Sequence, residues 1–200
     1  MLPSELAFLQ ALVWSLPAGP TLVEVGSWKG RSTTAICEAL EVHGGRLIAV
    51  DTFQGDPSTG IADVQREFHT NTARFARMID VIVGDSVDAA REVADGSVDC
   101  VFLDARHTYE AVVLDIGTWA SKLREGGIMC GHDYHHPPVG RAVRHHYGRV
   151  PVWCSIWYTT RRPGRHPVLR AKTRLSRLLR PHQNFYEDCS PPPSGGISRP

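Results

Sequence analysis

Short apolar segments alternate along this chain with longer segments in which apolar residues recur every three or four positions. The short segments favour strands buried on both faces, and the longer ones favour helices that cover them. The expected strands are 21–25, 46–50, 81–83, 98–103 and 127–131, with two more near 150–154 and 156–160. The expected helices are 4–16, 31–42, 61–78, 87–94, 109–123 and 138–147. This alternation predicts an α/β fold, with a mostly parallel sheet of seven strands and helices on both faces.

A glycine or an aspartate follows each of the five expected parallel strands. These residues are Gly26, Asp51, Asp85, Asp104 and Asp133. Because the carboxyl ends of parallel strands meet at one edge of a sheet, the topology brings the four aspartates together. A single such acid can be an ordinary loop residue or a helix cap, whereas four in corresponding positions favour a ligand site at this edge.

The first strand and the turn after it carry the most informative motif, E-x-G-x-x-x-G, formed by Glu24, Gly26 and Gly30. Glycines in such a turn let a ligand approach the backbone, and Asp51 can accept hydrogen bonds from both ribose hydroxyls of a nucleoside. A dinucleotide site would have a glycine in place of Glu24, whose carboxylate would face the pyrophosphate. The motif therefore favours a nucleoside cofactor with a cationic group, and an ordinary strand-to-helix turn is the alternative interpretation.

The overall composition is that of a single globular domain. The chain has 200 residues, a formal net charge of +1 and 42% hydrophobic residues, which suffices for a sizeable core. No apolar stretch is long enough to span a bilayer, and the first residues lack the basic start of a secretory signal. We therefore expect a cytoplasmic protein that makes no membrane contact.

A change of composition near residue 160 predicts the end of the folded domain. Arginines and one lysine, with no acid, crowd residues 161–182, and residues 190–196 are all serine, proline or glycine. We expect a domain over 1–160, with its N-terminal helix at 4–16, and a basic, then Pro/Gly/Ser-rich tail over 161–200 that is partly disordered. The basic segment lacks aromatic residues for base stacking, so nucleic acid is not an expected partner.

Three further segments resemble motifs of a known family. They are Val83-Gly84-Asp85-Ser86, the D-x-x-H-x-Y-E segment at 104–110, and the L-x-x-G-G-x-x-x-G-H-D-Y segment at 123–134. Together with the glycine-rich turn, they resemble family 24 of the class I S-adenosylmethionine-dependent methyltransferases, whose fold is Rossmann-like. The similarity extends over roughly residues 20–160, and Val139-Gly140 departs from it because the family pattern has these two residues in the reverse order.

The resemblance implies S-adenosyl-L-methionine as the cofactor and a small molecule as the methyl acceptor. The group includes enzymes that methylate hydroxyls of sugars on macrolide-type natural products, so O-methylation is the implied reaction. The residues implied to hold the cofactor are Glu24, Gly26, Ser27, Gly30, Ser32, Asp51, Thr52, Phe53, Gly84, Asp85, Ser86 and Asp104.

Removal of the acceptor's proton is the step that the protein has to assist. The resemblance implies that His107 acts as the general base, with Asp104 as the second catalytic residue, and imidazole titrates near working pH. The alternative is a histidine that only bonds a neighbouring loop or caps the helix beginning near residue 109.

A divalent cation would also lower the pKa of an acceptor hydroxyl. Asp104 and Asp133 end adjacent strands, and the resemblance adds His132, which stands where some relatives have a second acid. Mg²⁺ is the implied ion, although histidine adds no negative charge and magnesium prefers oxygen ligands. A site without metal, in which Asp133 braces a loop, is an equal alternative.

Two other functions are compatible with the sequence. One is an NAD-dependent oxidoreductase, against which Glu24 argues, and the other is a non-catalytic cofactor-binding module that serves a partner through its basic tail. About twenty residues precede the first strand, so a lid over the acceptor would come from residues 52–70, from the tail or from a second subunit of a homo-oligomer.

Overall fold

A computed structural model describes residues 1–54 and 63–160, and in this part of the chain seven strands form one sheet. The strands are β1 (Thr21–Val25), β2 (Arg46–Asp51), β3 (Ile79–Val83), β4 (Val98–Leu103), β5 (Leu123–Gly131), β6 (Val152–Trp153) and β7 (Ile156–Thr159). Their order is β3-β2-β1-β4-β5-β7-β6. The first five strands are parallel and the last two are antiparallel, which confirms the expected sheet.

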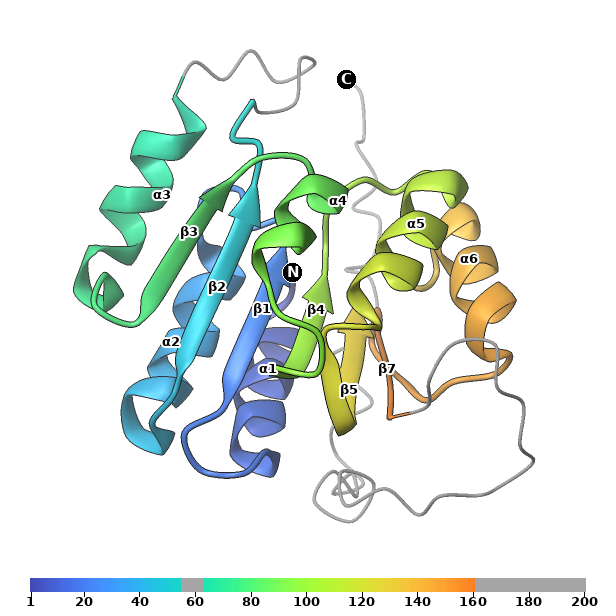
Figure 1. Ribbon diagram of the computed structural model, residues 1–200, viewed down its shortest axis with the longest axis horizontal. Helices are drawn as coiled ribbons and strands as arrows, with labels where there is room; N and C mark the ends of the chain where they lie inside the picture. Colours follow the sequence, from blue (N-terminus) through green and yellow to red (C-terminus); the bar gives the residue numbers. More distant parts are fainter. Residues whose placement is uncertain (55–62, 161–200) are drawn as a thin grey trace, which may run out of the picture.

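Helices cover both faces of the sheet. The α-helices of the described residues are α1 (Pro3–Ser15), α2 (Arg31–His43), α3 (Val64–Thr72), α4 (Ser86–Ala89), α5 (Tyr109–Trp119) and α6 (Pro137–Tyr147). Figure 1 shows α1 and α2 behind the sheet and α4 and α5 in front of it. Alternate residues of β1 serve the two layers, since Leu22 packs with α1 and α2 whereas Val23 packs with α5 and α6.

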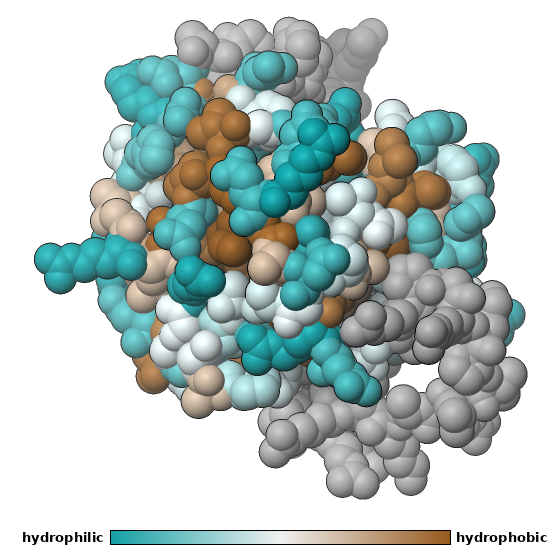
Figure 2. All heavy atoms as spheres, viewed as in Figure 1, coloured by the Kyte–Doolittle hydropathy of each residue, from teal (hydrophilic) through white to brown (hydrophobic). Residues whose placement is uncertain are grey.

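Burial is deepest in the middle of the sheet and decreases toward β3. All six residues of β4 are buried, and the edge strand β3 has no fully buried residue. Figure 2 shows apolar side chains at the surface over β2 and β3, between α3 and α4. The residues that follow β1, β4 and β5 therefore come directly after the most deeply buried strand ends of the fold.

Several element boundaries differ from the sequence prediction. The expected helix at 61–78 is α3, which ends at Thr72 and gives way to a 3-10 turn, so β3 begins at Ile79. The expected helix at 109–123 ends at Trp119. Leu123 instead pairs with Val98 ahead of an irregularity in the β4–β5 ladder, so β5 begins earlier than residue 127. Strand pairing sets where β3 and β5 begin, and a pattern of helical periodicity contains no information about that pairing.

Backbone hydrogen bonds link the strand tips across the carboxyl edge of the sheet. In each case the residue after one strand donates its N–H to a carbonyl at the end of the neighbouring strand. The bonds are Gly84 to Asp51 (3.0 Å), Gly26 to Val50 (2.8 Å), Asp104 to Val25 (2.8 Å) and His132 to Leu103 (3.0 Å). The ladder of the sheet thus continues into the loops that carry the expected site residues.

Two expectations fall on residues that the structure does not describe. Residues 161–200, the expected tail, lie outside the described part of the chain, as do residues 55–62 of the expected loop after β2. Among the helices of residues 1–54 and 63–160, none has the length and apolar character needed to cross a membrane.

Candidate active site

The glycine-rich loop between β1 and α2 is shaped by contacts within the protein. Gly26 has φ +93°, and a Cβ there would lie 2.3 Å from the backbone oxygen of Asp104. Gly30 has φ +83°, and its Cβ would lie 2.7 Å from Cγ2 of Thr72. Both positions therefore require glycine on conformational and steric grounds before any ligand is considered. The sequence analysis explained these glycines by the close approach of a ligand. The structure shows a second reason, because the end of β4 approaches Gly26 and the end of α3 approaches Gly30.

Asp51 organises the backbone on both sides of the expected ribose position. Its Oδ2 accepts a hydrogen bond from the N–H of Trp28 (2.7 Å) and its Oδ1 accepts one from Phe53 (2.7 Å). Each carboxylate oxygen retains acceptor capacity, so Asp51 can still bind two hydroxyls. Trp28 has φ +43° and is 49% exposed at the rim, where Thr52 is also exposed.

Phe53 was expected to contact the cofactor, but its side chain is buried in the protein. Its side chain is 9% exposed and stacks obliquely on Phe68 of α3, with ring centroids 5.1 Å apart. Ala49 and Val64 belong to the same apolar cluster. The phenyl ring thus anchors α3 to the sheet, and the contribution of Phe53 at the edge is its backbone N–H.

Glu24 lies beneath the glycine-rich loop and not at the mouth of the site. Its carboxylate is fully buried against the start of α2, where Thr33 donates a hydrogen bond to Oε2. Burial raises the pKa of Glu24 to about 7, although the hydroxyls of Ser32, Thr33 and Ser27 partly oppose that rise. Within the described residues, Glu24 Oε1 and Ser27 Oγ are buried without a hydrogen-bond partner of normal geometry. Each such atom costs about 1–3 kcal/mol as long as it has no partner.

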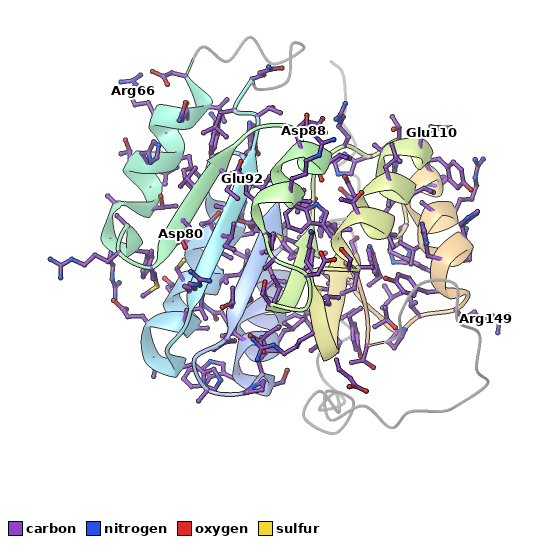
Figure 3. The ribbon with its side chains drawn as sticks, viewed as in Figure 1. Arg66, Asp80, Asp88, Glu92, Glu110 and Arg149 are labelled. Atoms are coloured by element: carbon purple, nitrogen blue, oxygen red, sulfur yellow. The ribbon has the colours of Figure 1, made fainter. Side chains whose placement is uncertain are left out.

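The expected cofactor-binding residues Gly84, Asp85 and Ser86 lie at the tip of β3. Asp85 caps α4 through the N–H of Val87 (3.1 Å) and forms an ion pair with Arg106. The Ser86 hydroxyl accepts a hydrogen bond from Trp119 Nε1 (2.9 Å) and is therefore engaged within the fold. No described atom lies within 4 Å of a Cβ built on Gly84, so space is open there. Figure 3 shows Asp88 and Glu110, both exposed, on the neighbouring helices α4 and α5.

Acids and histidines form a continuous cluster where β4 and β5 end. His107 Nε2 lies 2.9 Å from Asp133 Oδ2 and 3.6 Å from Asp104 Oδ1. His132 Nδ1 lies 3.2 Å from Asp133 Oδ1, and His132 Nε2 lies 3.1 Å from Glu5 Oε2. Asp133 adopts φ +56°, a conformation that is uncommon outside glycine and concentrates at functional sites. The structure thus brings the expected His107, Asp104, His132 and Asp133 together.

The charges of this cluster shift one another's pKa values strongly. Interactions with Asp104 and Asp133 raise the pKa of His107 to about 9. Burial lowers the pKa of His132, but its contacts with Asp133 and Glu5 outweigh burial and raise it to about 10. The two histidines hold the pKa of Asp133 well below its usual range, whereas burial raises the pKa of Asp104. Both imidazoles are therefore protonated at neutral pH while the site holds no other cation.

The donor set for a metal ion differs in one member from the expected one. One ligand atom each from Asp104, His107 and Asp133 can be chosen so that all three lie within 4.8 Å of one another. His132 was expected in this set, but its two nitrogens face Asp133 and Glu5. Two carboxylates suit Mg²⁺, and the nitrogen of His107 is better suited to a transition metal. The residues therefore fit a divalent cation, provided that the proton on His107 is displaced or the ring turns away.

Sequence reasoning missed two residues of this edge, Glu5 and Arg106. Glu5 is 2% exposed, and it occupies the first position of the buried face of α1, which continues through Phe8, Leu9, Leu12 and Val13. The sequence did contain a signal for Glu5, because an acid in line with the apolar positions of a helix is unusual and indicates a buried partner. Arg106 lies between the recognised Asp104 and His107, and its pairing with Asp85 has no signature in the spacing.

Comparisons with known proteins agree with this architecture. A family model described as a methyltransferase domain, family 24, matches residues 23–134. The uncharacterized protein y4gI of Sinorhizobium fredii is 30% identical over an alignment of 140 residues that covers 68% of this chain and 15% of that protein. This chain thus spans only a small part of the length of that curated relative.

Solved structures share the fold at low sequence identity. The O-methyltransferase NovP has a TM-score of 0.61 and 18% identity, with 77% of this chain and 78% of that chain covered. CalS11, a TDP-rhamnose 3'-O-methyltransferase of calicheamicin biosynthesis, has a TM-score of 0.59 and 16% identity, with 78% and 77% covered. Cofactor-bound Rv0187 from MTB has a TM-score of 0.59 and 19% identity, with 74% and 70% covered. At these identities the likeness establishes a shared fold.

The two site glycines provide a test of the loop geometry. We expect Gly26→Ala to lower the free energy of unfolding by about 2–4 kcal/mol, because its Cβ would collide with the β4 tip at a positive φ. Gly84→Ala meets no described atom, so its effect should stay within about 1 kcal/mol. Urea unfolding of the two variants and the wild type measures both values. Equal destabilisation by the two substitutions would contradict the geometry.

Burial of Glu24 predicts a specific pH dependence of stability. The pKa of Glu24 rises from 4.5 to about 7 on folding, so the folded state holds this proton to higher pH than the unfolded state. The corresponding stability is present below pH 4.5 and is lost as the pH rises through 7. Relative to Glu24→Gln, the wild-type free energy of unfolding should fall by about 1.4 kcal/mol per pH unit across this window. Parallel curves for the two proteins in urea titrations between pH 4.5 and 7.5 would refute the assignment.

Proposed function

This chain belongs to methyltransferase family 24, and we propose that it methylates a hydroxyl oxygen of a small molecule with S-adenosyl-L-methionine as the donor. The observation that carries the proposal is the placement of Asp51 and of the Asp104–His107–Asp133 cluster at one sheet edge. The family match overturns the alternative of an NAD-dependent oxidoreductase. Because the curated relative is far longer than this chain, the proposal concerns this domain.

A sugar on a natural product is the acceptor class that we favour. NovP is named as an O-methyltransferase and CalS11 as a TDP-rhamnose 3'-O-methyltransferase, and both share the fold of this chain. The carboxylates and imidazoles of the cluster offer hydrogen-bond acceptors and donors to the hydroxyls of a sugar. Three further features stay predictions. They are the division into a domain over 1–160 and a tail, the homo-oligomer, and the lid supplied by a second subunit.

The residues at the tips of β1, β2 and β3 are suited to hold the cofactor. Asp51 would accept the ribose hydroxyls, and the open space at Gly84 would admit the adenine. Glu24 lies beneath the glycine-rich loop with a pKa raised to about 7, and its carboxyl, when ionised, would disfavour a pyrophosphate bound over that loop. When bound, S-adenosyl-L-methionine supplies a methyl group that its sulfonium already activates.

The cluster at the tips of β4 and β5 would handle the acceptor's proton. His107 is 45% exposed at its side chain and can reach a ligand, and Asp133 orients its Nε2. A protonated His107 can only donate, so it acts as a base after losing the proton that Asp104 and Asp133 stabilise. His107 would lose that proton more readily once a bound cation neutralises the two carboxylates. We therefore propose Asp104, His107 and Asp133 as the residues that a Mg²⁺ ion would contact, and His107 as the base when it is not a ligand.

Cofactor binding and turnover can be separated at His107. We expect His107→Ala to bind S-adenosylhomocysteine within about threefold of the wild type, because it lies outside the β1–β3 tips, and to lose about 10²–10⁴-fold in turnover. Calorimetry measures the first value. Release of S-adenosylhomocysteine with a panel of hydroxylated acceptors that includes TDP-rhamnose measures the second. His69→Ala, an exposed position on α3, serves as the control. Binding without turnover on any acceptor by the wild type would favour the non-catalytic module.

The proposed cation site can be tested without any acceptor. Mn²⁺ replaces Mg²⁺ at oxygen-rich sites and enhances the relaxation of water protons when bound. We expect the wild type to bind Mn²⁺, and Asp104→Asn and Asp133→Asn each to weaken binding by at least tenfold. Asp80→Asn on β3, remote from the cluster and exposed, should bind as the wild type does. Equal affinities in all four proteins would remove the metal from the proposal.

A further inference from the structure

The first helix sends one buried carboxylate into the acid–histidine cluster. Glu5 Oε2 accepts a hydrogen bond from the N–H of Leu2 (2.7 Å) and lies 3.1 Å from His132 Nε2, while Oε1 accepts one from Ser155 (3.1 Å). Glu5 thereby joins α1, the tip of β5 and the turn between β6 and β7. Two of these three elements lie outside residues 23–134, so the family match does not account for the contact.

From Glu5 the contacts continue to the residue proposed as the base. His132 Nδ1 lies 3.2 Å from Asp133 Oδ1, and the other oxygen of Asp133 lies 2.9 Å from His107 Nε2. Every link joins an acid to a ring nitrogen, so each ring orientation depends on the carboxylate beside it. His132 has a side chain only 12% exposed and is confined between Glu5 and Asp133. His132 Nδ1 also lies 3.7 Å from Asp104 Oδ1, which is 3.6 Å from His107 Nε2, but the contacts through Asp133 are shorter. A change at Glu5 therefore reaches His107 through the orientation of His132, most directly by way of Asp133.

We propose that Glu5 is a positioning residue of the methyl-transfer site, which fixes His132 so that Asp133 presents its free oxygen to His107. The inference rests on the proposed function for its effect on turnover, and on geometry alone for its effect on the rings. The ionic contact of Glu5 within the cluster is with His132, and not with Asp104 or His107, the residues proposed to act on the acceptor. Glu5 therefore acts through His132.

A purely structural role for this carboxylate is the competing explanation. Glu5 begins the buried stripe that continues with Phe8, Leu9, Leu12 and Val13 of α1. Burial of an ion pair is often neutral or unfavourable for stability compared with apolar residues of similar volume. A Glu5→Met variant would extend the apolar stripe, keep the length of the side chain and remove the contact with His132. It therefore separates packing from positioning.

The experiment compares Glu5→Gln and Glu5→Met with the wild type and with Glu38→Gln. Glu38 of α2 is a matched control, because it also accepts a hydrogen bond, from Gln10 of α1, but at the exposed surface. We expect both Glu5 variants to bind S-adenosylhomocysteine as the wild type does and to lose about 10–100-fold in kcat with TDP-rhamnose or the best acceptor of the panel. The ring ¹⁵N–¹H signals of His132 and His107 should both move, and Glu38→Gln should change none of these values.

Two outcomes would overturn the proposal. The first is a folded Glu5→Met protein whose kcat stays within twofold of the wild type. The second is a change confined to the His132 signals, with those of His107 unmoved. The ring signals need no acceptor, so a wild type without turnover would count against the proposed function and leave the positioning test intact. Should Glu5→Gln not fold, Glu5→Met carries both measurements.

Discussion

Backbone hydrogen bonds between neighbouring strand tips are the constraint on which the rest of this site depends. Gly26, Gly84, Asp104 and His132 each donate to the end of an adjacent strand, so the loops start from fixed points. The most buried strand, β4, stands at the centre and carries Asp104 directly after it. Side chains from distant parts of the sequence can then meet within hydrogen-bond distance, because the positions of their backbones are already set.

The second organising feature is competition for the same carboxylates. Asp104 and Asp133 stabilise a proton on His107, and the same two acids are the oxygen donors that a divalent cation would use. A bound cation and a protonated His107 therefore oppose each other, and loss of one charge favours the other. If the proposed cation binds, it would favour the unprotonated form of His107, which is the form that the proposed base requires.

The sequence predicted the features that follow from period and topology. Alternating segments indicated the parallel sheet, and the residues after each strand indicated the edge along which Asp51, Asp85, Asp104 and Asp133 lie. The motifs did not predict side-chain direction. Glu24 occupies a recognisable motif position but points under α2, because successive residues of β1 face opposite layers. His132 is likewise in the expected place, and its partners Glu5 and Asp133 determine what its nitrogens can do. Glu5 itself is 127 residues away in the sequence, a contact that no local pattern reports.

The central claim is that the tips of β1 to β5 form one site for an adenosyl cofactor and its acceptor. A crystal structure with S-adenosylhomocysteine and Mg²⁺ tests it most directly. The account predicts the ribose hydroxyls on the carboxylate of Asp51, the adenine beside Gly84, and the sulfur facing the space between Asp104 and His107. A cofactor bound elsewhere on the molecule, or one whose sulfur faces away from the Asp104–His107–Asp133 cluster, would contradict it.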